Sequence, residues 1–126
     1  QSEADLRLAE QYGIPKEDPS RAEVMEKALR LACSVPLEIM EACCTAIGLH
    51  GELAEKGSTM VLSDVGVGVI CCKSALMGAS LNVFINTKSM QDRQYAGDAE
   101  RKADAMLEKY CAEADRIYAS VLGRLR

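Results

Sequence analysis

The chain has 126 residues, of which 48% are hydrophobic, 27% charged and 4% aromatic, and its formal net charge is -4. This length indicates one domain or part of one, and the composition is that of a soluble globular protein. Lysine and arginine are scattered among acidic residues, without the basic, aromatic-rich patch that nucleic-acid binding requires. The amino terminus lacks the apolar segment of a secretory signal. We predict no membrane span, because the most apolar window, residues 60–85, contains Asp64 and Lys73, which are costly in lipid.

The six cysteines are interpreted as core residues rather than as a metal or disulfide framework. Four of them form the adjacent pairs Cys43–Cys44 and Cys71–Cys72 inside helical patterns, and no C-x-x-C spacing occurs. The single histidine, His50, offers no second imidazole ligand and is interpreted as a surface or packing residue. Free cysteine packs as a small apolar side chain. Unpaired thiols indicate a reduced, cytoplasmic protein, and we predict no metal site.

The first predicted helix is short and ends at Gly13, because leucine and alanine recur among charged residues up to that glycine. Residues 14–19 contain two prolines and are predicted to form a connector. Ser20 and Glu23 have the spacing of a capping box, in which the hydroxyl and the carboxylate each bind a free backbone amide. This pair predicts the start of a second helix.

Pro36 lies inside the helical pattern that follows. Because proline removes a backbone donor, it predicts a kink or a break between Cys33 and Leu37. The helical spacing of apolar residues resumes over residues 37–56. Gly57 is predicted to end this helix.

A short loop over residues 58–62 is predicted to precede a long central helix. Either Ser58 or Ser63 can cap this helix, with Asp64 in its first turn, and the helix runs past Asn86. A last helix is predicted over residues 98–122, with Gly123 as its cap. No strand alternation competes with these patterns, so the sequence predicts an all-α bundle of long helices.

Steps of three, four and seven residues place one set of side chains on a single face of the central helix. Asn82 and Asn86 stand there in otherwise apolar sequence, and a buried unsatisfied amide costs on the order of 1–3 kcal/mol. The two asparagines therefore either pair across a helix or subunit interface or line a polar pocket. The small residues on this face let another helix come close. The whole set is Asp64, Gly68, Cys71, Ala75, Gly78, Asn82, Asn86 and Arg93.

Asp64 has two interpretations. It caps the helix start, or it joins Ser63 and the free amides there in binding a polar heterocycle or positioning a proton donor. Lys88, Arg93 and Lys73 are either solvated surface residues or partners of an anionic ligand.

Several segments carry a resemblance to a known family. Residues 63–67 (SDVGV), 75–79 (ALMGA) and 81–86 (LNVFIN) are similar to the C-terminal domain of the formiminotransferase-cyclodeaminase family, whose stand-alone members include the methenyltetrahydrofolate cyclohydrolases. Three more segments support it in the same order: IPK at 14–16, SVPL at 34–37 and LAEKG at 53–57. The resemblance covers residues 1–126, which correspond to about the last two thirds of the family domain, without its N-terminal glycine-rich segment.

The resemblance implies an all-α homodimer that acts on a tetrahydrofolate derivative as substrate. Its members open or form 5,10-methenyltetrahydrofolate by acid/base catalysis, as cyclohydrolases or as formiminotetrahydrofolate cyclodeaminases, and need no metal. An alternative is a non-catalytic helical dimerisation module that retains the fold.

The resemblance also assigns site residues. Asp64 would be the catalytic proton shuttle or the pterin anchor, with Ser63 beside it. Asn82 and Asn86 would be pocket or interface residues. Lys88 or Arg93 would meet the glutamate carboxylates of folate.

Overall fold

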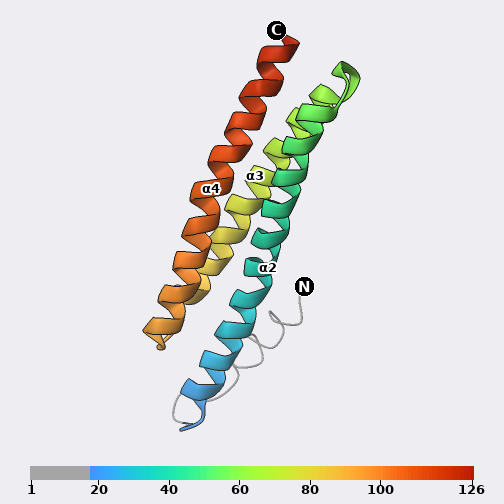
Figure 1. Ribbon diagram of the computed structural model, residues 1–126. Helices are drawn as coiled ribbons and strands as arrows, with labels where there is room; N and C mark the ends of the chain where they lie inside the picture. Colours follow the sequence, from blue (N-terminus) through green and yellow to red (C-terminus); the bar gives the residue numbers. More distant parts are fainter. Residues whose placement is uncertain (1–17) are drawn as a thin grey trace.

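The computed structural model describes residues 18–126, which form three long helices joined by short turns (Figure 1). The helices are α2 (Arg21–Lys56), α3 (Thr59–Lys88) and α4 (Arg93–Leu125). No strand occurs within residues 18–126, which confirms the all-α prediction. The predicted helix ending at Gly13 and all but the last two residues of the predicted connector lie outside the described residues.

The three helices lie side by side, and α3 runs antiparallel to both α2 and α4 (Figure 1). Large aliphatic side chains from α2 and α3 fill the centre, including Met40, Ile47, Val69 and Leu76, all fully buried. Each contributes roughly 1.5–3 kcal/mol to folding by leaving water. The buried side of α4 is made largely of alanine, which lets this helix approach the other two closely.

Helix α2 continues through Pro36 without interruption, so of the two predicted outcomes, a kink or a break, the break is wrong. Proline cannot donate to the carbonyl four residues earlier, which belongs to Ala32. The side-chain amide of Asn86 on α3 donates to that same carbonyl at 3.4 Å. Pro36 is itself buried. A neighbouring helix thus replaces the missing donor, and the helix persists.

The predicted capping box at the start of α2 is also wrong. Ser20 occupies the N-cap position, but its hydroxyl makes no hydrogen bond to a helix amide. It donates instead to Asp18 at 2.7 Å, and the Ser20 amide donates to the same carboxylate at 2.9 Å. This turn formed by Asp18 competes with the capping arrangement.

Gly57 ends α2 as predicted, and its amide donates to the Leu53 carbonyl at 2.7 Å. Helix α3 then begins at Thr59, with Ser58 at the N-cap position. Ser63 and Asp64 therefore lie beyond the first turn, where backbone amides are already bonded to carbonyls four residues back. The prediction that Asp64 stands in the first turn among free amides is wrong.

Helix α4 begins at Arg93, five residues earlier than predicted. The carboxylate of Asp92 accepts a hydrogen bond from the Tyr95 amide at 3.0 Å and caps the helix there. The helix also passes through Gly123, so the predicted cap at this glycine is wrong.

Two helices, α2 and α3, are long and apolar enough to cross a membrane by length and composition alone. Core helices of soluble proteins pass the same test. In the apolar window of α3, however, only 28% is buried within the chain. A helix that is apolar on all sides is normally covered on all sides, so the exposed side of α3 is a candidate binding surface.

Candidate functional site

One side of α3 faces neither α2 nor α4 and is exposed along the length of the helix. We call this side the outer face of α3. It combines large apolar side chains with small and polar ones, and it contains three of the predicted site residues. Its members are Met60, Ser63, Asp64, Val67, Ile70, Cys71, Ser74, Ala75, Met77, Gly78, Leu81, Asn82 and Ile85.

Within one chain the predicted site residues fall into two separate groups. Ser63 and Asp64 lie near the start of α3, whereas Asn82 and Asn86 lie near its end. At 1.5 Å per residue, the 18 residues between Asp64 and Asn82 span about 27 Å. The structure therefore brings the two asparagines together but does not bring Asp64 to them.

The two asparagines have different surroundings. Asn86 is half-buried, and its amide donates to the Asn82 carbonyl at 2.8 Å and to Ala32 on α2 at 3.4 Å. The bond to Ala32 agrees with the interpretation that Asn86 forms a structural hydrogen bond between two helices. Asn82 is exposed, and its nearest acceptor, the Gly78 carbonyl, lies at 3.5 Å, too far for a strong bond. Its amide is available to a ligand or a partner.

The two predicted cations also differ. Lys88 is exposed at the last position of α3. The guanidinium of Arg93 donates to the carbonyls of Thr87 and Met90, both at 2.9 Å. The Thr87 carbonyl lies in the last turn of α3, where a cation is favoured by the helix dipole, and the Met90 carbonyl lies in the turn that follows. Arg93 thus holds the turn between α3 and α4.

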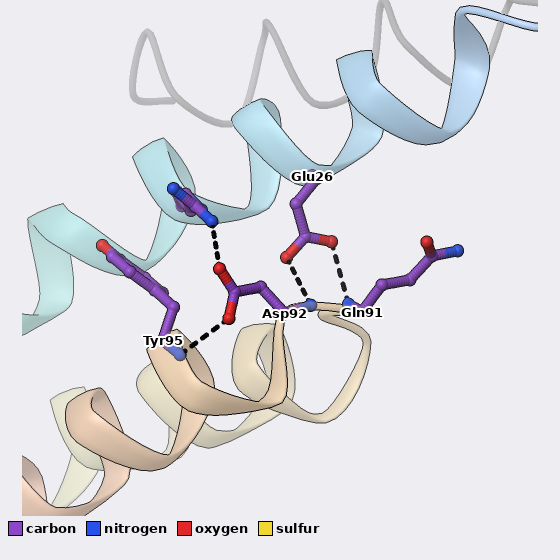
Figure 2. A network of polar contacts seen from close by, with 5 residues as sticks. Glu26, Gln91, Asp92 and Tyr95 are labelled. Atoms are coloured by element: carbon purple, nitrogen blue, oxygen red, sulfur yellow. Dashed lines mark hydrogen bonds and ion pairs between the residues drawn. The ribbon is translucent and has the colours of Figure 1, made fainter.

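The same turn is fastened to α2 by a polar network that no local sequence pattern predicted (Figure 2). The carboxylate of Glu26 accepts hydrogen bonds from the amides of Gln91 and Asp92, at 2.8 and 3.1 Å. Arg30 donates to the Asp92 carboxylate at 2.5 Å and lies 4.6 Å from the centre of the Tyr95 ring. Within this network, only the cap of α4 has a local sequence signal, because Asp92 is an aspartate that directly precedes the helix. The network fixes the fold at this end of the bundle.

His50 emerges as the second acid/base group near Asp64. Its Nδ1 atom lies 2.7 Å from the Ala46 carbonyl. A carbonyl only accepts, so Nδ1 carries the proton, and Nε2 of the neutral ring carries a lone pair. Nε2 lies against Gly68 on α3, where an added Cβ would stand only 2.3 Å away. Gly68 is one helical turn from Asp64, so His50 packs against α3 within one turn of that carboxylate residue.

A groove of about 590 Å³ lies elsewhere, between α2 and α4. Its walls carry both signs of charge, and none of the predicted site residues lines it. We assign the site to the outer face of α3 instead, because the acid/base side chains lie there. The groove is lined by Gly48, Gly51, Glu52, Ala54, Glu55, Glu113, Arg116, Ile117, Ser120 and Arg124.

The cysteines follow the core interpretation only in part. Cys33 and Cys44 are buried, and burial raises the pKa of both thiols, for Cys44 to about 11. Cys71 is exposed on the outer face, so the core interpretation is wrong for this residue. Among the described residues, no group of three or more histidine, cysteine or acidic side chains is arranged to hold a metal ion.

These observations define an all-helical domain with acid/base side chains beside an exposed apolar helix face. Residues 2–105 match the family described as formiminotransferase-cyclodeaminase. The chain is 36% identical over 118 residues to the methenyltetrahydrofolate cyclohydrolase of Methylorubrum extorquens, which covers 90% of the chain and 57% of that protein. It is 30% identical over 131 residues to the formimidoyltransferase-cyclodeaminase of Sus scrofa, covering 98% of the chain and 24% of that protein.

The chain belongs to the formiminotransferase-cyclodeaminase family, as its sequence resemblance predicted. It spans somewhat more than half the length of the cyclohydrolase and about a quarter of the longer relative.

Proposed function

We propose that this protein is a folate-dependent one-carbon enzyme that opens or forms 5,10-methenyltetrahydrofolate, and in particular a methenyltetrahydrofolate cyclohydrolase. The supporting observation is the 36% identity to a protein of that name over 90% of the chain. The cyclodeaminase reaction is the second candidate, because the formimidoyltransferase-cyclodeaminase of Sus scrofa aligns with 98% of the chain.

The proposed chemistry requires one group that accepts a proton and one that returns it. Water adds to the methenyl carbon and loses a proton to the acceptor. The tetrahedral carbon then breaks its bond to N5, which takes up a proton, while the hydroxyl group on that carbon loses its proton and becomes the formyl carbonyl of 10-formyltetrahydrofolate. Side chains positioned for such transfers contribute typically 10²–10⁴-fold to the rate.

Asp64 and His50 are the proposed pair for these transfers. The carboxylate of Asp64 is exposed, and the lone pair of His50 Nε2 is directed toward α3 within one helical turn of it. Ser63 is proposed to hydrogen-bond the pterin beside this pair. Asn82, about 27 Å from Asp64 along α3, is proposed as an interface residue, and Lys88 is proposed to meet the glutamate carboxylates. Asn86 and Arg93 are proposed only to shape the site, since their polar atoms bond to the chain itself.

The decisive variant is Asp64→Asn, assayed by the loss of methenyltetrahydrofolate absorbance. We expect turnover to fall 10²-fold or more. Asp104→Asn is the matched control, because Asp104 is an exposed carboxylate on α4 and is not part of the outer face of α3. Turnover equal in the two variants, with unchanged circular dichroism, would remove Asp64 from the mechanism. Ammonia release from formiminotetrahydrofolate separates the cyclodeaminase from the cyclohydrolase.

We further propose a cytoplasmic homodimer as the working unit. The free thiols support the compartment, and the exposed apolar side of α3 supports association. The alternative is a dimerisation module without activity. A folate that binds only the folded state must raise the melting temperature, so the absence of any shift at saturating folate would favour the module.

A further inference from the structure

The ends of α2 and α4 and the start of α3 lie at the same end of the bundle (Figure 1). The two proposed proton-transfer residues lie there as well, His50 less than two turns before the end of α2 and Asp64 in the second turn of α3. Because the two residues belong to different helices, their relative position depends on how α2 and α3 are held together. Helix α4 packs against both of these helices.

Two glycines let α4 approach both helices closely at this end. An added Cβ on Gly51 of α2 would lie 3.3 Å from Cδ1 of Ile117 on α4. An added Cβ on Gly66 of α3 would lie 3.1 Å from Cγ1 of Val121 on α4. Ile117 and Val121 are both buried, so these contacts belong to the core. A side chain at either glycine would force α4 to move outward, because a close-packed interior has no space to absorb it.

These close approaches lie next to the proposed proton-transfer residues. Gly51 directly follows His50, and Gly66 is two residues after Asp64. The His50 ring makes a third close approach, between α2 and α3, where it lies against Gly68. Each pair of helices is therefore in tight contact within one helical turn of His50 or Asp64. Because tightly packed helices transmit small shifts, the position of α4 affects where the imidazole lies relative to the carboxylate.

Arg124 fastens the last turn of α4 to the last turn of α2. Its guanidinium donates to the Ala54 carbonyl at 2.5 Å. Ala54 is among the last four residues of α2, whose carbonyls have no donor within their own helix, and a cation is favoured at this helix end. Arg124 follows Ile117 by seven residues and Val121 by three, so the three side chains share one side of α4. The hydrogen bond thus holds α4 to the turn that directly follows His50.

We propose that Arg124 is a positioning residue for the proposed active site. Together with the buried side chains of Ile117 and Val121, it seats α4 against both other helices. This seating fixes where the His50 imidazole lies relative to the Asp64 carboxylate. Arg124 acts through the end of α2 and not through contact with the substrate. The effect on catalysis rests on the proposed function, whereas the effect of Arg124 on the His50 ring does not.

The first test follows the His50 ring by NMR, because His50 is the only histidine of the chain and its signals are unambiguous. In the native protein the two ring nitrogens should show a proton on Nδ1 and a lone pair on Nε2. In Arg124→Ala we expect these signals to shift or broaden, because the ring loses its fixed place against α3. Arg124→Lys keeps a donor for the Ala54 carbonyl and should restore them. Arg126→Ala is the matched control, because Arg126 is an exposed arginine two residues away, and it should leave them unchanged.

The second test separates kcat from KM for methenyltetrahydrofolate. A displaced reacting group can lose up to about 10²-fold in rate, so we expect kcat of Arg124→Ala to fall about 10-fold or more, with KM within about two-fold of native. Arg124→Lys should recover most of this loss, and Arg126→Ala should match the native protein. A residue that only stabilises the bundle would leave kcat unchanged below the unfolding transition, and one that binds substrate would raise KM instead.

Three outcomes overturn the proposal: unchanged His50 signals in Arg124→Ala, an unchanged kcat in that variant of an active protein, or a raised KM alone. If Arg124→Ala loses its helical circular dichroism, Ile117→Val decides instead. This variant removes only the methyl group that lies against Gly51, and it should shift the same His50 signals, so unchanged signals there also overturn the proposal. If the native chain turns over neither folate, the proposed function fails, and the NMR result still decides whether Arg124 positions His50.

Discussion

The hydrogen bond between Asn86 and the Ala32 carbonyl leads to a sharp prediction about α2. Pro36 leaves that carbonyl without its helix donor, and Ala32 is only 7% exposed, so water replaces the donor poorly. A typical hydrogen bond contributes about 0.5–1.5 kcal/mol net, and a buried unsatisfied acceptor costs about 1–3 kcal/mol. Because the observed distance of 3.4 Å is long, we expect Asn86→Ala to reduce the free energy of unfolding by about 1 kcal/mol.

The prediction becomes specific in a double-mutant cycle with Pro36→Ala. Alanine at position 36 restores a backbone donor for the Ala32 carbonyl, so Asn86→Ala should cost almost nothing in that background. The expected coupling energy is about 1 kcal/mol, measured by urea unfolding of the four proteins. Asn82→Ala is the matched control, because Asn82 is exposed and does not reach α2. If Asn86→Ala costs the same with and without Pro36, to within about 0.3 kcal/mol, the compensation does not exist.

Three further predictions concern single contacts and one buried thiol. Gly68→Ala should cost about 1–3 kcal/mol of stability, because its Cβ would stand 2.3 Å from His50 Nε2. Gly48→Ala is the control, because an added Cβ there meets nothing within 4 Å, and it should be neutral or stabilising. Equal changes in the free energy of unfolding for the two variants, measured in urea, would contradict the contact between position 68 and His50. Glu26→Gln weakens the two hydrogen bonds to the amides of Gln91 and Asp92, and it should cost about 1 kcal/mol. Glu23→Gln serves as its control, since Glu23 is exposed and its partner among the described residues is Lys27, in a surface ion pair of little energetic weight. Burial raises the pKa of the Cys44 thiol from 9.0 to about 11, so stability from this group is complete below pH 9 and declines as pH rises to about 11. Cys44→Ala should flatten that decline, and an unchanged pH profile of unfolding would show that Cys44 does not contribute.

The helical architecture could be predicted because it depends on periodic patterns within each segment. Helix termini were harder, because local signals compete there. Ser20 was expected to cap α2, yet its hydroxyl bonds to Asp18 two residues earlier. Pro36 is disruptive by local rules alone, and only the amide of Asn86 from another helix allows α2 to continue through it.

The candidate site residues also divide into what local sequence patterns predict and what only the packing of the helices decides. Sequence alone determined that the chain is all-α, that it belongs to a folate-related enzyme family, and that α3 carries the polar residues to consider. The tertiary structure decided which of them are available: it uses Arg93 and Asn86 in hydrogen bonds to the chain and leaves Asp64 and Asn82 exposed. It also placed His50 next to Gly68, a contact between different helices that no local pattern contains. The physical reason is that periodicity records which side of a helix is apolar, whereas the partner of each side chain depends on how the helices pack.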